Sequence, residues 1–230
     1  MIENYLTENQ KDRPVLEASS EHIALALVLD VSGSMQGEKI NSLIEAINSM
    51  IAWMKEDRRL KFIVDLAIFV FGEKGRENVL QGFCAIGECN PINLSATDSS
   101  TWVADSLNIA VDRLRERTEM YNKTGGAYKP WLVLVTDGEF FDSEEELNKV
   151  SQRIKQREKE GKLHFFGLGV EGYIKDQMMK FTEDPRKVMD VKASNFQEFF
   201  SWVGRSLATV SRTEVGTATT MEPLVFTMDS

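Results

Sequence analysis

The sequence predicts an α/β fold with three layers: a mostly parallel central sheet, one antiparallel edge strand, and helices on both faces. Two observations carry this prediction. Short, continuous apolar segments rich in Leu, Ile and Val alternate along the chain with longer segments whose apolar residues recur at helical spacing. Polar loops containing Gly, Ser or Asp follow several of the apolar segments. Strands alternating with helices imply right-handed crossovers and a sheet covered on both sides.

The first unit is a strand, a loop and a helix. Residues 22–30, HIALALVLD, form an apolar run that stops at a Gly/Ser loop, as expected for a strand buried on both faces. Apolar residues at helical spacing follow from Ile40 to Met54 and end at the charged sequence KEDRR. We therefore expect this helix to pack one apolar stripe on the sheet.

A hairpin is predicted next. Residues 61–71, KFIVDLAIFVF, read as a second strong strand. The sequence GEKGREN then turns the chain into VLQGFCAI at residues 79–86, a weaker strand that can return antiparallel at one edge of the sheet.

The remaining elements repeat the alternation. Thr101 opens an amphipathic segment, so we expect it at a helix N-terminus, with the polar loop SATDSS available for capping. Trp131–Val135 is a third buried strand, and Thr136, Asp137 and Gly138 follow it. Later elements are expected as a helix at 143–160, a strand at 162–170, a short helical stretch at 174–181, a weak strand at 188–191 and a helix at 195–210.

The expected organisation is one domain at residues 21–211 between two tails, residues 1–20 and 212–230. The tails lack helical or strand periodicity, although the apolar residues 224–226 are candidates for docking on the domain.

Composition excludes several classes of partner. The formal net charge is −9 and the sequence pI is about 4.9, which argues against general affinity for nucleic acid or an anionic membrane. The basic residues Arg153, Lys155, Arg157 and Lys159 read as the solvated face of a helix. The sequence shows neither a signal peptide nor an apolar stretch of about 18 residues, so we expect a cytoplasmic protein.

Cysteine and histidine give little indication of a zinc site. Cys84 and Cys89 lie five positions apart, while His22 and His164 are distant in sequence. A zinc site normally takes four ligands in paired spacing, so we interpret the two cysteines as reduced, structural thiols.

Oxygen-bearing side chains gather where predicted strands end or a helix begins. Asp30, Ser32 and Ser34 follow the first strand at alternate positions, Thr101 precedes a helix, and Asp137 follows the third buried strand. Ligands of open α/β sheets bind outside the carboxyl ends of the strands, so we expect these five to converge. Two carboxylates and three hydroxyls suit a hard cation such as Mg²⁺, with Mn²⁺ or Ca²⁺ as alternatives. Only two negative charges would face the dication, which leaves a place for a carboxylate from a protein partner.

These residues resemble a known motif. DVSGS at residues 30–34 is similar to the D-x-S-x-S sequence of von Willebrand factor A (vWA) domains with a metal-ion-dependent adhesion site (MIDAS), and the Thr and TDG elements follow in the expected order. The resemblance covers residues 23–210 and implies Ser32, Ser34 and Thr101 as direct or near-direct ligands, with Asp30 and Asp137 binding directly or through water. Thr101 lies in TWVADSLNIA, which departs from the family's T-x-x-G-D-A-L pattern by having Ala104 where Gly is usual.

Two further segments resemble a bacterial subgroup. YKPWLVLVTDGEFFD and FQEFFSWVGRSLATVSR are similar to patterns of cytoplasmic tellurium-resistance proteins of the TerY-like type. That resemblance implies a vWA interaction module in a stress-response or phage-defence assembly.

Several neighbouring residues have more than one interpretation. Asp98 and Asp105 lie near Thr101, where an acidic residue in a first helical turn is favoured by the helix dipole without binding metal. Glu139, Phe140 and Phe141 follow the last metal loop, and their aromatic rings are suited either to partner contact or to the core, as is that of Trp102.

The expected function is a non-enzymatic, metal-dependent protein-interaction module whose partner presents Asp or Glu. One alternative is a Mg²⁺-dependent phosphoryl-transfer enzyme, although the chain has neither a D-x-D pair at the first strand nor a G-x-x-x-x-G-K-[ST] loop. Another is a scaffold with a purely structural metal that binds partners through other surfaces, such as the loop at residues 118–129.

Overall fold

A mixed sheet of six strands forms the centre of the computed structural model, which describes residues 7–72, 79–97 and 100–216. The strand order is β3-β2-β1-β4-β5-β6, and all neighbours are parallel except the edge pair β2 and β3. The strands are β1 (Ile23–Asp30), β2 (Val64–Phe71), β3 (Val79–Ala85), β4 (Trp131–Thr136), β5 (His164–Val170) and β6 (Val188–Val191). The helices are α1 (Glu38–Glu56), α2 (Leu60–Ile63), α3 (Ala104–Tyr121), α4 (Glu144–Lys159), α5 (Lys175–Met178) and α6 (Phe196–Val210). The predicted fold class is confirmed.

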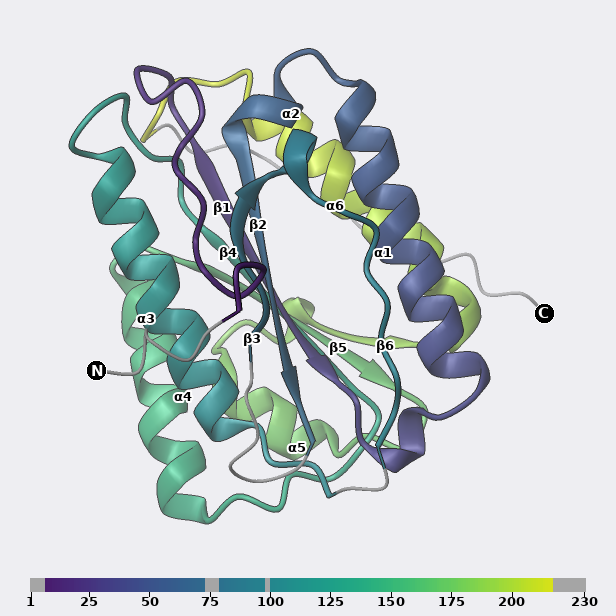
Figure 1. Ribbon diagram of the computed structural model, residues 1–230. Helices are drawn as coiled ribbons and strands as arrows, with labels where there is room; N and C mark the ends of the chain where they lie inside the picture. Colours follow the sequence, from purple (N-terminus) through teal and green to yellow (C-terminus); the bar gives the residue numbers. More distant parts are fainter. Residues whose placement is uncertain (1–6, 73–78, 98–99, 217–230) are drawn as a thin grey trace.

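Helices cover both faces of the sheet. Figure 1 shows α1 and α6 together on one face and α3 and α4 on the other. The side chains of β1 show why both faces need a cover, because successive side chains of a strand point to opposite faces and here both sets are apolar. Leu25, Leu27 and Leu29 belong to the hydrophobic cluster under α1 and α6, whereas Ala24 and Ala26 belong to the cluster under α3 and α4. All residues of β1 are buried, as the uninterrupted apolar run predicts.

Local sequence signals set the ends of α4. Ser143 is its N-cap, and the Ser143 hydroxyl accepts a hydrogen bond from the backbone N–H of Glu146. The Glu146 carboxylate accepts in return from the backbone N–H of Ser143 at 2.8 Å, which completes a capping box. Arg157 and Lys159 lie in the last turn, where the helix dipole favours positively charged side chains.

Strand β2 and helix α3 begin later in the chain than the sequence predicts. The second strand begins at Val64 rather than at Lys61, because Leu60–Ile63 form the short helix α2. The Asp57 carboxylate explains this turn, since it accepts hydrogen bonds from the backbone N–H groups of Arg59 and Leu60 at 2.8 and 2.9 Å. The other difference is that α3 begins at Ala104, three residues after Thr101.

Residues 9–13 lie along the edge strand β3. The backbone N–H of Gly82 donates to Asn9 O at 2.9 Å, and that of Arg13 donates to Phe83 O at 2.7 Å. An added Cβ at Gly82 would lie 2.4 Å from Lys11 O, so this close approach of two backbones requires glycine. The segment covers an edge that would otherwise present unpaired backbone groups.

No helix within residues 7–72, 79–97 and 100–216 has the length and apolar character needed to cross a bilayer. Cys84 and Cys89 are buried and carry free thiols. The residues at 224–226, considered above for docking, lie outside the described part of the chain, as does most of the loop between β2 and β3.

Candidate metal centre

The predicted metal loops lie side by side at the carboxyl edge of the sheet. Asp30 is the last residue of β1, and Asp137 directly follows the last residue of β4. Strands β1 and β4 are hydrogen-bonded parallel neighbours, with Leu29 opposite Val135, so their two following loops emerge together. Ser32 and Ser34 lie on the 3₁₀ turn after β1, which spans Gly33–Met35 with Ser32 as its N-cap.

Asp30 anchors the first loop. Its side chain is fully buried, with Oδ1 accepting from the backbone N–H of Ser32 at 2.8 Å and Oδ2 accepting from the Thr136 hydroxyl at 2.6 Å. Burial raises the pKa of Asp30, and the hydrogen bonds from Ser32 and Thr136 oppose that rise. Thr136 lies on β4, so this carboxylate also joins the two strands.

Three side chains form a continuous hydrogen-bonded row across the two loops. The hydroxyl oxygens of Ser32 and Ser34 are 3.0 Å apart, and the Ser34 hydroxyl donates to Asp137 Oδ1 at 2.6 Å. Ser34 and Asp137 are separated by 103 positions in the chain. Ser32 and Asp137 are buried, whereas Ser34 between them is exposed, so the middle of the row is open to solvent.

Thr101 reaches the same place from a third segment. It pairs with Phe140 in a parallel bridge, and its carbonyl accepts from the backbone N–H of Phe141 at 3.0 Å. A Cβ added at Gly138 would lie 3.0 Å from Thr101 Oγ1 and 3.8 Å from Ser34 Oγ. The two hydroxyls therefore border one small space beside Gly138. The structure brings all five predicted side chains together, whereas their role as metal ligands stays a prediction.

The helix after Thr101 is capped by a residue that the sequence did not single out. The Asp142 carboxylate accepts hydrogen bonds from the backbone N–H groups of Val103 and Ala104 at 2.8 and 3.0 Å. It comes from the loop after β4 and holds the start of α3 against that loop. Thr101 is thus free of the capping role, and its hydroxyl faces the other loops.

Sequence reasoning also missed Lys39. Its ammonium forms an ion pair with Asp137 Oδ2 and donates to Glu171 O at 3.1 Å. Lys39 lies in the first turn of α1, where a solvated side chain is the usual expectation. Its distance from Asp137 in sequence hides the contact, and only the neighbouring positions of β1 and β4 make it predictable.

The structure distinguishes between the two interpretations given above for residues near the site. Asp105 is exposed in the first turn of α3, and Asp98 lies outside the described residues. Phe140 is buried in the core, whereas Phe141 is 55% exposed and its ring lies 6.4 Å from that of the half-buried Trp102. Glu139 is exposed beside them. Phe141, Trp102 and Glu139 are therefore the solvent-accessible side chains at the rim of the site.

The donor set fits a hard divalent cation. It consists of two carboxylates and three hydroxyls, the oxygen ligands that Mg²⁺ prefers. Within the described part of the chain, no group of three or more His, Cys, Asp or Glu side chains has the arrangement of a metal site.

Solved structures with a similar fold include von Willebrand factor A domains. The vWF domain of the type V pili tip protein Mfa5 from Porphyromonas gingivalis has a TM-score of 0.59 at 9% identity, covering 86% of this chain and 99% of that one. A von Willebrand factor type A structure from Catenulispora acidiphila has a TM-score of 0.57 at 16% identity, covering 83% and 43%. Proximal thread matrix protein 1 from the mussel byssus has a TM-score of 0.54 at 13% identity, covering 83% and 47%. This mussel protein has also been solved with a zinc-occupied MIDAS motif.

The chain spans less than half the length of the mussel and Catenulispora chains. No family model matches the sequence, and no curated protein matches it. At these identities the similarity concerns the fold, and it agrees with the observed strand order and helical layers. The chain has the fold of a von Willebrand factor A domain.

Proposed function

We propose that this protein is a non-enzymatic interaction module that binds a partner protein through a divalent cation, Mg²⁺ in the first place. Asp30, Ser32, Ser34, Thr101 and Asp137 would hold the cation, directly or through water. A bound cation would supply a positive centre that a partner's Asp or Glu can complete.

The observation that carries this proposal is the row from Ser32 through Ser34 to Asp137. Its hydrogen bonds, at 3.0 and 2.6 Å, join two loops far apart in sequence, and Thr101 borders the same space beside Gly138. Short Asp/Ser loops are also good turn formers, but turn formation alone does not bring side chains from three segments together.

The rim around the site supports a protein as the ligand. Phe141 exposes a large apolar ring next to Trp102, and aromatic residues are enriched where proteins bind each other. The similar solved structures include a pilus tip domain and a byssus matrix protein, which agrees with an adhesive role. We place this chain in the bacterial cytoplasm, in a stress-response or defence assembly, on its resemblance to the TerY-like tellurium-resistance proteins.

Metal titration tests the first half of the proposal. Isothermal titration calorimetry with MgCl₂ should show one binding event for the wild type that is lost in Asp137→Ala and Ser34→Ala. Asp105→Asn is the matched control, since it removes an exposed carboxylate from the start of α3 and should bind Mg²⁺ as the wild type does. Wild-type protein that takes up neither Mg²⁺, Mn²⁺ nor Ca²⁺ would contradict the proposal.

Affinity purification from a TerY-encoding bacterium tests the second half. Partners should bind in Mg²⁺ and be released by EDTA, and Phe141→Ser should weaken capture without changing Mg²⁺ affinity. Partners retained equally in EDTA would instead favour the scaffold with a structural metal. Metal-dependent turnover of a phosphate ester that Asp30→Asn abolishes would favour the phosphoryl-transfer enzyme.

A further inference from the structure

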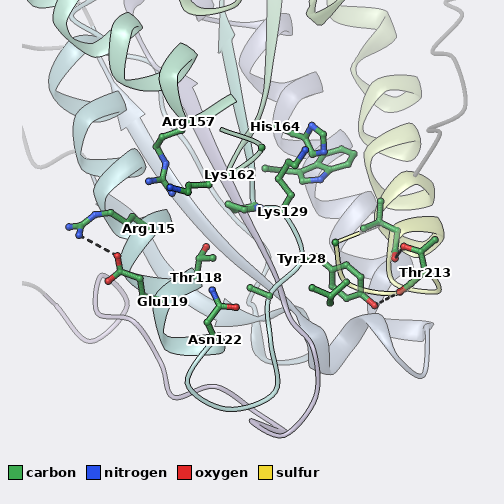
Figure 2. Close-up of a pocket in the computed structure, with 17 residues that line it drawn as sticks. Arg115, Thr118, Glu119, Asn122, Tyr128, Lys129, Arg157, Lys162, His164 and Thr213 are labelled. Atoms are coloured by element: carbon green, nitrogen blue, oxygen red, sulfur yellow. Dashed lines mark hydrogen bonds and ion pairs between the residues drawn. The ribbon is translucent and has the colours of Figure 1, made fainter. Parts of the chain in front are cut away.

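A cavity lies at the opposite edge of the sheet from the metal loops. Its volume is about 810 Å³, within the usual size of small-molecule sites. Trp131 and His164, the first residues of β4 and β5, line it, together with the ends of α3 and α4 and the segment after α6. Figure 2 shows Arg157, Lys129 and His164 lying around this space.

The cavity is basic although the chain is acidic. Its described lining contains four cationic side chains and one carboxylate, on Arg115, Lys129, Arg157, Lys162 and Glu119. The protein as a whole has a formal net charge of −9. Arg115 pairs with Glu119 at 3.4 Å and Lys162 pairs with Glu160 at 2.8 Å, so two of the four cations are neutralised at the rim.

The other two cations have no carboxylate partner within the described part of the chain. Lys129 and Arg157 form no ion pair there, and Arg157 Nε is buried without a hydrogen-bond acceptor. The indole Nε1 of Trp131 is a second buried N–H donor without an acceptor. Buried donors in folded proteins nearly always bond to protein, water or a ligand, so two such donors at one cavity indicate that water or a bound group supplies their acceptors.

The position of Arg157 at the end of a helix explains only part of the positive charge at the cavity. Arg157 lies in the last turn of α4, where a cation is favoured by the helix dipole. Lys129 lies in the connection before β4, where no helix ends. Burial lowers the pKa of Lys129, and the charge of Lys187 lowers it further, against the effect of Glu158. Lys129 thus adds positive charge at the cavity that the helix end does not explain.

We propose that this cavity binds a small organic phosphate, with Lys129 and Arg157 holding the phosphate group. The planar guanidinium of Arg157 offers donors that match phosphate oxygens, and Lys129 adds a compact charge. Space remains for an organic group, and Pro130, Val210 and Val215 provide apolar lining for it. This site is separate from the proposed metal centre and does not depend on it.

Binding is tested by calorimetry in EDTA at constant ionic strength, with adenosine monophosphate and inorganic phosphate as probes. We expect adenosine monophosphate to bind at micromolar to millimolar concentration and more tightly than inorganic phosphate. Arg157→Gln and Lys129→Gln should each weaken its binding about tenfold. Lys123→Gln removes the same charge from an exposed position outside the cavity lining, and it should change affinity less than twofold.

A second measurement uses the wild-type protein alone. The Trp131 indole N–H signal in ¹H–¹⁵N spectra, assigned with Trp131→Phe, should shift on addition of adenosine monophosphate. The proposal is overturned if neither probe binds at millimolar concentration, if Lys123→Gln weakens binding as much as the cavity variants, or if the indole signal does not move. Equal affinity for both probes would overturn the organic part of the ligand and leave a site for inorganic phosphate alone.

Discussion

The ammonium of Lys39 forms an ion pair with Oδ2 of Asp137, whose other oxygen accepts from Ser34. The Lys39 side chain is 25% exposed and that of Asp137 is fully buried, so solvent screens the pair incompletely. One of the two carboxylates proposed for the cation therefore already has a positive neighbour. Lys39 would lower the net negative charge that a dication meets.

Replacing Lys39 with Met should tighten Mg²⁺ binding by about threefold to tenfold, because a competing positive charge is removed. Calorimetric titration with MgCl₂ measures the change. Lys123→Met is the control, since it removes an exposed charge away from the site and should leave the affinity unchanged. Weaker Mg²⁺ binding by Lys39→Met would mean that Lys39 orients Asp137 rather than competing with the cation.

The space beside Gly138 gives a steric prediction. An added Cβ would lie 3.0 Å from Thr101 Oγ1, closer than an ordinary van der Waals contact. Gly138→Ala should push the Thr101 hydroxyl away and weaken Mg²⁺ binding about tenfold, with little loss of stability because Gly138 is only half-buried. Titration and thermal melting of the same sample check both statements.

Gly37 offers the matched comparison. It also lies near the first loop, but a Cβ there would meet nothing within 4 Å, and its φ of +83° strains any other residue. Gly37→Ala should therefore lower stability by about 1 kcal/mol without a steric effect on Thr101. Equal Mg²⁺ affinity in wild type and Gly138→Ala would show that the Thr101 hydroxyl is not needed for binding.

The fold was predictable because it depends on local patterns. The run IALALVLD is long enough for a strand and apolar on both faces, and Ser143 with Glu146 forms the capping box that starts α4. The start of β2 was less predictable, since the helical turn at Leu60–Ile63 depends on hydrogen bonds that one side chain, the Asp57 carboxylate, accepts from the backbone.

The site was predictable only where a motif marks it. The D-x-S-x-S spacing and the TDG sequence identify side chains that the structure does place together. Lys39 pairs with Asp137 and Asp142 caps the helix after Thr101, yet no local pattern distinguishes these two from solvated or ordinary acidic residues. Their contacts depend on which strands are neighbours, and the same is true of Arg157 in the basic cavity. Arg157 was expected on a solvated face, whereas its Nε is buried.

A buried ion pair joins β2 to α3 under the edge of the sheet. Arg117 is 1% exposed and donates to Asp65 Oδ2 through Nε and Nη2 at 2.9 and 2.6 Å, and the Tyr121 hydroxyl donates to the same oxygen at 2.5 Å. Burial raises the pKa of Tyr121 well above its usual value, and Asp65 adds to that effect. Arg117→Met should lower the free energy of unfolding by about 3–5 kcal/mol, because it leaves the Asp65 carboxylate buried without a countercharge.

Urea unfolding of two further variants separates charge from packing. Tyr121→Phe removes the hydrogen bond to Asp65 and the longer one from Arg117 Nε, and it should lower the free energy of unfolding by about 1–2 kcal/mol. The double variant Asp65→Leu with Arg117→Met removes both charges and should be more stable than Arg117→Met alone. A double variant no more stable than the single one would show that Arg117 acts through packing and through its hydrogen bond to Arg13 O.

His164 gives a prediction about pH. Burial, followed by the charges of Lys129 and Lys187, lowers the pKa of His164 to about 3 from the usual value of 6.5. The unfolded chain therefore binds one more proton than the folded chain between about pH 6.5 and pH 3. The stabilising effect of the neutral folded histidine is complete above pH 6.5 and is lost as the pH falls through this window. It contributes a slope of at most about 1.4 kcal/mol per pH unit.

His164→Phe keeps an aromatic ring against Trp131, whose ring centroid lies 5.9 Å from that of His164, and removes the titration. Urea unfolding from neutral pH down to about pH 4.5 should show a shallower loss of stability in this variant than in the wild type. Because the chain has only one other histidine, His22, the His164 ring signal is readily assigned in NMR spectra. That signal should stay in its neutral position across the same range, whereas a midpoint near 6.5 would show that the ring is solvated and that the cavity around Lys129 carries less positive charge than its geometry indicates.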